Sequence, residues 1–382
     1  MSEPLLKIPN HHAPGCGDPP IVNGDDPAVY IGYFENSFRE QWIFTYDRAT
    51  KRGELRGGDV GWNSVHVVEN GNVVGLVLGV EEASWLQACW RITITATDQT
   101  DDLTKSLSQS GGYVITHVVK IERTDGSVFS SDSSEEVLFC LHHFLSFALG
   151  RWAGLALPVG FTDSGEKVFE QWGLPMAASG EWSGGQSWFD LHHGQLLSEV
   201  FPGFWALWSE PLWQKAIREC LYWYIAANER GTGIGIDTGL ILCQTALEHL
   251  AWTVCVKVRK LVSTQAFSVR GLNAADKIRL LITSLGIPAT IPATLGDLAK
   301  PPSHISGGKW DDGPHALTEI RNASIHPDAK LTPTHGAYID AWKLSIWLVE
   351  MCLLRLCDHR GSYGNRLVRR WTGQVEKVPW SA

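Results

Sequence analysis

The sequence predicts an α+β protein of more than one domain, with an antiparallel, β-rich N-terminal domain followed by an all-α helical bundle. Two observations predict this class. Short runs of β-branched and aromatic residues, such as YIGYF, QWIFTY and VVGLVL, dominate from Tyr30 onward. From Pro211 the apolar residues recur at helical spacing instead. The 382 residues leave room for about two to three domains. We therefore expect a flexible arm, a β-rich domain, a connector and a helical domain at 1–25, 26–175, 176–209 and 210–382.

Turn signals and a capping signal organise the β-rich part. Asn70-Gly71 and Asp125-Gly126 predict two hairpins, and Asp163-Ser164-Gly165 predicts a third between ALPVGFT and EKVFEQW. Two helices are expected among the strands, at EEASWLQACW and at SSEEVLFCLHHFLSFAL. Ser133 and Glu136 have the spacing of a capping box that opens the second of these helices.

The C-terminal half reads as five helices without strands. The first starts at Pro211 and the second at Asp237 or Thr238, while Asn273 caps the third and Gly286 ends it. The fourth helix is expected from about 314 to 326 and the fifth from about 336 to 358. This pattern predicts a bundle.

Composition favours a cytoplasmic protein with no membrane contact. The N-terminal sequence has no basic segment followed by an apolar stretch, so we expect no signal peptide. The longest uninterrupted apolar run, at 221–227, is far below the ~20 residues of a membrane span. The eight cysteines form no CxxC pair, so we expect reduced thiols and no structural zinc.

Charge is divided between the two halves of the chain. The formal net charge of −9 argues at first against a nucleic-acid partner. Residues 1–250, however, hold 15 Lys and Arg against 31 Asp and Glu, whereas residues 251–382 hold 17 against 10. The C-terminal part is therefore basic, and phosphate contacts would use such charge.

The expected fourth helix ends in EIRNASIHPD, the segment with the strongest chemical signal. Arg321 lies one helical turn from both Leu317 and Ile325, on an apolar ridge. Pro327 disfavours helical geometry at His326, so the helix should end there and the imidazole can approach the guanidinium. An Arg-Asn pair followed by His four to six positions after the Arg is expected by chance only about 0.05 times in a chain of this composition.

Arginine and histidine together suffice for cleavage of RNA without a metal. Arg321 would supply a permanently charged clamp for a phosphate, and His326 would transfer a proton near neutral pH. RNA carries its own nucleophile in the 2′-hydroxyl, so no metal and no cofactor is expected. The product of such an attack is a 2′,3′-cyclic phosphate.

These residues resemble the motif of the HEPN superfamily, all-helical proteins that carry Arg, a polar residue and then His. The match is Arg321-Asn322-Ala323-Ser324-Ile325-His326, and the resemblance extends over about 205–360, including TGLILCQTALEHLAW and DKIRLLITSLGIPATIPATLGDLAK. The N-terminal part, with YIGYFENSFREQWIFTY, GDVGW and WLQACW, is similar to the β-rich region of ApeA-like anti-phage proteins.

The resemblance implies an endoribonuclease whose active site forms between two copies of the chain. Arg321 and His326 of both copies would face one another, and Asn322 would orient the catalytic pair. Its expected partners are an RNA substrate such as tRNA or single-stranded RNA, a second copy or a higher homo-oligomer, and a phage-derived protein trigger in abortive infection.

Other polar residues are open to two interpretations. Glu248 is a candidate partner of the catalytic Arg, although a solvated or ion-paired Glu fits its position as well. Lys257, Arg259 and Lys260 are candidate RNA contacts, and a helix terminus that complements the helix dipole explains them equally.

Metal and nucleotide sites find less support. The His-His pairs at 11–12, 142–143 and 192–193 lack an HExxH pattern, and His142-His143 fits packing within a helix. Asp190 with His192 and His193 is the best metal candidate, and GTGIGIDTG lacks the Lys-Ser/Thr of a P-loop. Two alternatives to the ribonuclease thus remain: a catalytically inactive HEPN binding and assembly module with a Trp-rich recognition domain, and a metal hydrolase.

Overall fold

The computed structural model describes two compact units. It describes the backbone of five N-terminal strands and, beyond them, residues 90–97, 100–110, 114–171, 187–190, 192–229, 235–268, 272–300, 310–326, 331–369, 371 and 373–381. Unit 1 comprises residues 1–145 and 152–184, and unit 2 comprises residues 146–151 and 185–382. The expected arm at 1–25 lies outside the described residues.

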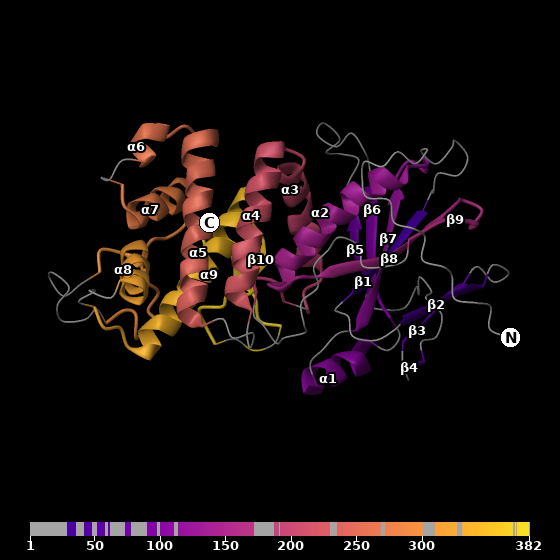
Figure 1. Cartoon of the computed structure of the whole chain (residues 1–382), viewed down its shortest axis with the longest axis horizontal. Coiled ribbons are helices and arrows are strands. Elements are labelled where there is room, and N and C mark those ends of the chain that lie inside the picture. Colours follow the sequence, from indigo (N-terminus) through magenta and orange to yellow (C-terminus); the bar gives the residue numbers. More distant parts are fainter. Residues whose placement is uncertain are drawn as a thin grey trace. The chain divides into compact units, whose positions relative to one another are not determined.

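Unit 1 contains an antiparallel sheet of six strands (Figure 1). Its strand order is β5 (Val73–Val77), β6 (Trp90–Ala96), β7 (Ile115–Arg123), β1 (Val29–Glu35), β8 (Gly154–Phe161) and β9 (Lys167–Glu170). A smaller antiparallel sheet holds β2 (Trp42–Asp47), β3 (Arg52–Gly57) and β4 (Val60–Gly61). Strand β8 is buried along nearly its whole length, as its continuous apolar sequence requires. The expected β-rich, antiparallel N-terminal part is confirmed.

The three predicted hairpins have different outcomes. The turn at 163–165 joins β8 to β9 as expected, with Gly165 left-handed and the Thr162 N–H donating to the Glu166 carbonyl at 2.8 Å. The prediction at Asp125-Gly126 is wrong: a turn forms there, but the chain enters a helix instead of a second strand. The Asn70-Gly71 turn lies outside the described residues, and β5 pairs with β6.

Two helices accompany the sheet, α1 (Thr100–Ser110) and α2 (Ser131–Leu149). The Ser133 N–H donates to the Ser130 hydroxyl at 3.3 Å, so Ser130 caps α2. The capping box at Ser133 and Glu136 predicts a later start of this helix. The helix starts earlier because the Ser130 hydroxyl lies three residues before the Ser133 N–H group and accepts its hydrogen bond. The helix predicted at 81–90 lies outside the described residues except for Trp90, which begins β6.

Unit 2 is predominantly helical, as the sequence predicts. The predicted helices correspond to α4 (Pro211–Asn228), α5 (Ile236–Ala251), α7 (Ala274–Leu285), α8 (Gly313–Ile325) and α9 (His335–Leu356). The cap predictions for α7 are confirmed, because Asn273 accepts from the Asp276 N–H at 2.9 Å and Gly286 is left-handed with φ 72°.

The sequence prediction misses the short α6 (Thr264–Ser268) and the strand pair β10 (Ser362–Tyr363) and β11 (Glu376–Lys377). It also does not give the 14-residue length of α3 (Gln195–Trp208) within the expected connector, or the π geometry of Trp252–Val258, which continues α5. The expectation that this half has no strands is therefore wrong. Two-residue strands carry no periodicity, and only the tertiary pairing of distant segments creates them.

Helices α4, α5 and α9 pack against one another at the centre of unit 2 (Figure 1). Trp342 of α9 donates to the Ala227 carbonyl at the end of α4 at 2.8 Å. Gly239 of α5 faces this indole, since a Cβ atom there would lie 2.9 Å from Trp342. Among the described residues one segment, Ile236–Val258, is long and apolar enough to span a membrane, and 67% of its most apolar stretch is buried, the pattern of a core helix.

Candidate functional site

Helix α8 positions the Arg-Asn-x3-His motif, and α7 fixes its first turn. Asp312 caps α8 by accepting from the His315 N–H at 2.9 Å. The same carboxylate receives two hydrogen bonds from Arg279 of α7, at 2.5 and 3.1 Å. At the other end, α8 stops at Ile325 with His326 as its extended C-cap, as Pro327 predicts.

Arg321 lies between the core and the surface. Leu317, one turn earlier, is 1% exposed, whereas Ile325, one turn later, is 37% exposed. The predicted apolar ridge therefore runs out of the core at the motif. Arg321 is half-buried and donates from Nη1 to Asn322 Oδ1 at 3.2 Å. Its Nε atom is buried and has no hydrogen-bond partner in the described part of the chain. The guanidinium therefore has donors left for an anion.

His326 is exposed, and its backbone N–H donates to the Asn322 carbonyl at 3.0 Å. Within the described residues no hydrogen bond joins its imidazole to Arg321. The expected approach of the imidazole to the guanidinium therefore remains a prediction. The extended backbone at His326, with φ −107° and ψ 112°, leaves the helical path at this residue.

The predicted auxiliary residues have partners of their own. Glu248 accepts from Gln244 at 3.0 Å and pairs with Lys277 of α7 at 3.4 Å, so the structure gives it the ion-paired role. Arg259 donates to the Ser284 carbonyl at the end of α7.

Lys257 and Lys260 are exposed where the π-helix ends. Lys257 lies 5.2 Å from the centre of the Trp252 ring. Lys260 has φ 51°, an unusual backbone for a residue other than glycine. Both ammonium groups therefore remain available for phosphate contacts.

The candidate metal-binding side chains make hydrogen bonds with backbone groups. Asp190 accepts from the backbone N–H groups of His192 and Gly373, at 2.9 and 3.2 Å. His193 contacts the Gly373 carbonyl through Nε2 at 2.8 Å. No group of three or more His, Cys, Asp or Glu that would suit a metal occurs among the residues that the structure describes.

The other candidates from the sequence give no site. His142 is buried, bonds the Ala153 carbonyl at 2.6 Å and stacks on Trp152, which agrees with packing in α2. Burial lowers the pKa of His142 to about 4. His11-His12 and the first four residues of GTGIGIDTG lie outside the described residues, and the rest of that segment forms the N-cap and first turn of α5. The six described cysteines are buried and free, in line with reduced thiols.

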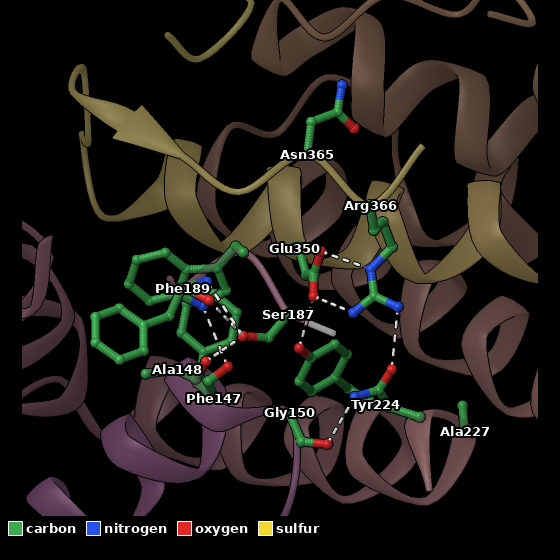
Figure 2. Close-up of polar contacts among 12 residues, drawn as sticks. Phe147, Ala148, Gly150, Ser187, Phe189, Tyr224, Ala227, Glu350, Asn365 and Arg366 are labelled. Carbon is green, nitrogen blue, oxygen red and sulfur yellow. Dashed lines mark hydrogen bonds and ion pairs between the residues drawn. The ribbon is translucent and has the colours of Figure 1, made fainter. Parts of the chain in front are cut away.

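A buried ionic network in unit 2 was missed by the sequence analysis (Figure 2). Arg366 donates to both oxygens of Glu350, at 2.9 and 2.5 Å, and Tyr224 donates to Glu350 Oε1 at 2.7 Å. Glu350 is 0% exposed and Arg366 is 4% exposed. Burial by itself would lower the pKa of Arg366, but the Glu350 carboxylate offsets this and the pKa is raised.

The network continues to the end of α2. Arg366 Nη1 donates to Asn228 Oδ1 at 3.0 Å, and Asn228 Nδ2 donates to the Gly150 carbonyl at 2.8 Å. Trp188 donates to the neighbouring Phe147 carbonyl at 3.1 Å. The signal for this network was a single acidic residue, Glu350, within the apolar stretch SIWLVEMCLL.

Two family models match the chain. The model described as the YopA C-terminal domain matches residues 210–377, and the model described as the YopA central domain matches residues 84–183. The first match begins where the sequence analysis placed the start of the helical domain.

One curated relative was found by the sequence search. It is the SPbeta prophage-derived uncharacterized protein YopA of Bacillus subtilis (strain 168), which is 30% identical over 281 residues. The aligned part is 72% of this chain and 60% of the relative, so the chain spans less than two thirds of the relative's length. No solved structure matches the chain.

Proposed function

We propose that unit 2 is a HEPN-type, metal-independent endoribonuclease. The observation that carries the proposal is the state of Arg321 at the surface end of α8. It combines a half-buried cation, a buried Nε donor without a partner among the described residues, and a neighbouring amide that orients the guanidinium. The Nη groups of this half-buried guanidinium offer further donors to a phosphodiester oxygen.

In this mechanism the 2′-hydroxyl of the RNA attacks the adjacent phosphorus and the 5′-oxygen leaves. Arg321 stabilises the charge that develops on the phosphate, and Asn322 holds the guanidinium in place. His326 transfers the proton that the 2′-hydroxyl loses and the leaving 5′-oxygen gains. The products are a 2′,3′-cyclic phosphate and a 5′-hydroxyl.

The active site requires a second copy of the chain. In one copy His326 is exposed and no hydrogen bond joins its imidazole to Arg321 among the described residues, so in this proposal the histidine that completes the site comes from a homodimer partner. Ile325 supports this arrangement, because it is an exposed apolar side chain between the two motif residues.

The biological role that we propose is cytoplasmic anti-phage defence by abortive infection, with a phage-derived protein as the trigger and without membrane contact. The prophage origin that the relative's name states agrees with a role in contact with phages. Unit 1 would sense the trigger.

The test is cleavage of tRNA and of single-stranded RNA by the full chain in EDTA, with and without an extract of phage-infected cells. Arg321→Ala with His326→Ala should abolish cleavage, and the products of the unmodified chain should end in a cyclic phosphate. Arg360→Ala is the matched control, because Arg360 is an exposed arginine of the same unit that pairs with Asp358 at 3.3 Å.

Full cleavage by the double variant would refute the assignment. Absence of cleavage under every condition, with an intact dimer, would favour the inactive binding and assembly module instead.

A further inference from the structure

Trp371 is an exposed aromatic side chain on the C-terminal segment of unit 2. Its side chain is 84% exposed, whereas every other tryptophan with a described side chain is buried or half-buried. A tryptophan in contact with water forgoes the large gain that burial of its ring brings. The exposure of this ring indicates a binding partner that covers it.

Hydrogen bonds restrain the described backbone around Trp371. The Trp371 N–H donates to Gln374 Oε1 at 3.1 Å, and the Gln374 N–H donates back to the Trp371 carbonyl at 3.0 Å. Between them, left-handed Gly373 is bound on both sides, by Asp190 at its N–H and by His193 at its carbonyl. The ring is therefore presented by an anchored backbone, and its binding to a partner costs little conformational entropy.

The segment that carries the ring is basic in its sequence. Arg369 is exposed and has no ion pair within the described residues, and Arg370 adjoins Trp371 in the sequence. None of the other large apolar side chains described from residue 359 onward is exposed. A protein interface has a cluster of apolar residues at its centre, which the described residues of this segment do not supply. An exposed aromatic ring on a basic segment is instead typical of sites on which nucleic-acid bases stack while arginines neutralise the phosphates.

We propose that Trp371 and Arg369 form a binding site for single-stranded nucleic acid. One base stacks on the indole, and the guanidinium contacts the adjacent phosphate. Paired bases in a duplex are stacked on one another and do not offer a free face, so the site selects single strands. This binding does not require Arg321 or His326, and it therefore stands apart from the proposed cleavage.

The test measures the affinity of the full chain for a fluorescently labelled oligouridine by anisotropy. The Arg321→Ala, His326→Ala background is used, so that the probe stays intact whether or not the unmodified chain cleaves RNA. Trp371→Ala should weaken binding by about five- to 150-fold, the range for loss of one stacked base. Trp371→Phe should retain most of the affinity. Arg369→Ala should reduce the slope of log affinity against log salt concentration by about one, because one phosphate contact is lost.

Tyr222→Ala is the matched control, because Tyr222 is 60% exposed on α4 and lies outside the proposed site. This variant should bind like its parent, and a duplex RNA of the same length should bind more weakly than the oligouridine. Equal affinity of Trp371→Ala and its parent, or no binding by either, would overturn the proposal. A changed oligomeric state of Trp371→Ala on a sizing column, at unchanged affinity, would overturn it in favour of a protein partner.

Discussion

Arg321 and Arg366 belong to the same unit but have opposite surroundings. Arg366 is 4% exposed, and its guanidinium donates to both oxygens of Glu350 and to Asn228 (Figure 2). Arg321 is half-buried, donates to its sequence neighbour Asn322, and keeps a buried Nε that has no partner in the described part of the chain. One arginine is saturated by the protein, and the other has donors to spare.

This difference distinguishes an arginine whose charge is fully paired within the fold from one that can still bind an anion. A saturated, buried guanidinium cannot bind a ligand without breaking a pair whose separation leaves an uncompensated charge in the core. A partly satisfied guanidinium at a surface gains from an added anion. The contacts of Arg366 are those of a stabilising residue, whereas ligand binding by Arg321 is the proposed function, and the following substitutions test both roles through the free energy of unfolding.

The largest expected effect is that of Arg366→Ala. It leaves the Glu350 carboxylate buried without its cation, and we expect a loss of about 3–5 kcal/mol in the free energy of unfolding. Urea unfolding followed by circular dichroism, with hydrogen exchange of the α9 amides, would measure it. Arg366→Met combined with Glu350→Leu should lose less than Arg366→Ala, since it removes both charges. A loss below about 1 kcal/mol for Arg366→Ala would contradict the structural role.

Asn228→Ala should have the next largest effect. Asn228 is 3% exposed and connects Arg366 to the Gly150 carbonyl, so its removal leaves a buried donor and a buried acceptor without this partner. We expect a loss of about 1–3 kcal/mol by the same urea measurement. Asn322→Ala serves as the comparison at the half-buried motif, where water replaces the lost contact. Equal losses for the two variants would show that burial does not distinguish the sites.

Gly150→Ala tests the end of α2 from the backbone side. Gly150 has φ 67°, and a Cβ atom there would lie 2.4 Å from Asn228 Nδ2. Left-handed backbone costs about 1–2 kcal/mol for a residue with a Cβ atom, and the contact forces Asn228 to move as well. Gly126→Ala provides the control, because it has φ 72° but meets nothing within 4 Å. Thermal unfolding should show the larger decrease for Gly150→Ala, and the reverse order would exclude the contact as its cause.

Arg321→Ala should have the smallest effect on stability. It removes a half-buried side chain whose described hydrogen bond is to the adjacent residue, so the free energy of unfolding should change by less than about 1 kcal/mol. If the proposed function holds, the same variant loses RNA cleavage at unchanged stability. A destabilisation comparable to that of Arg366→Ala would make Arg321 a structural residue and remove the basis for its catalytic assignment.

Local signals in the sequence predicted the elements around the motif well. Asn273 and Gly286 act on N–H and carbonyl groups within a few positions, so the ends of α7 follow from adjacent residues alone. The end of α8 at His326 likewise depends on Pro327. The capping prediction at Ser133 failed because Ser130 presents the same signal three residues earlier.

Only the tertiary structure decided which charges are buried. Glu350 meets Arg366 across 16 positions and Arg366 meets Asn228 across 138, and no local pattern encodes such distant contacts. Likewise, the sequence placed Arg321, Asn322 and His326 at one helix end, but packing determined that the Arg321 Nε donor is unpaired among the described residues and that His326 is exposed. The sequence by itself determined the order of the elements and the position of the motif, because caps and periodicity are local. Burial sums contacts from the whole chain, so it was decided by the folded unit.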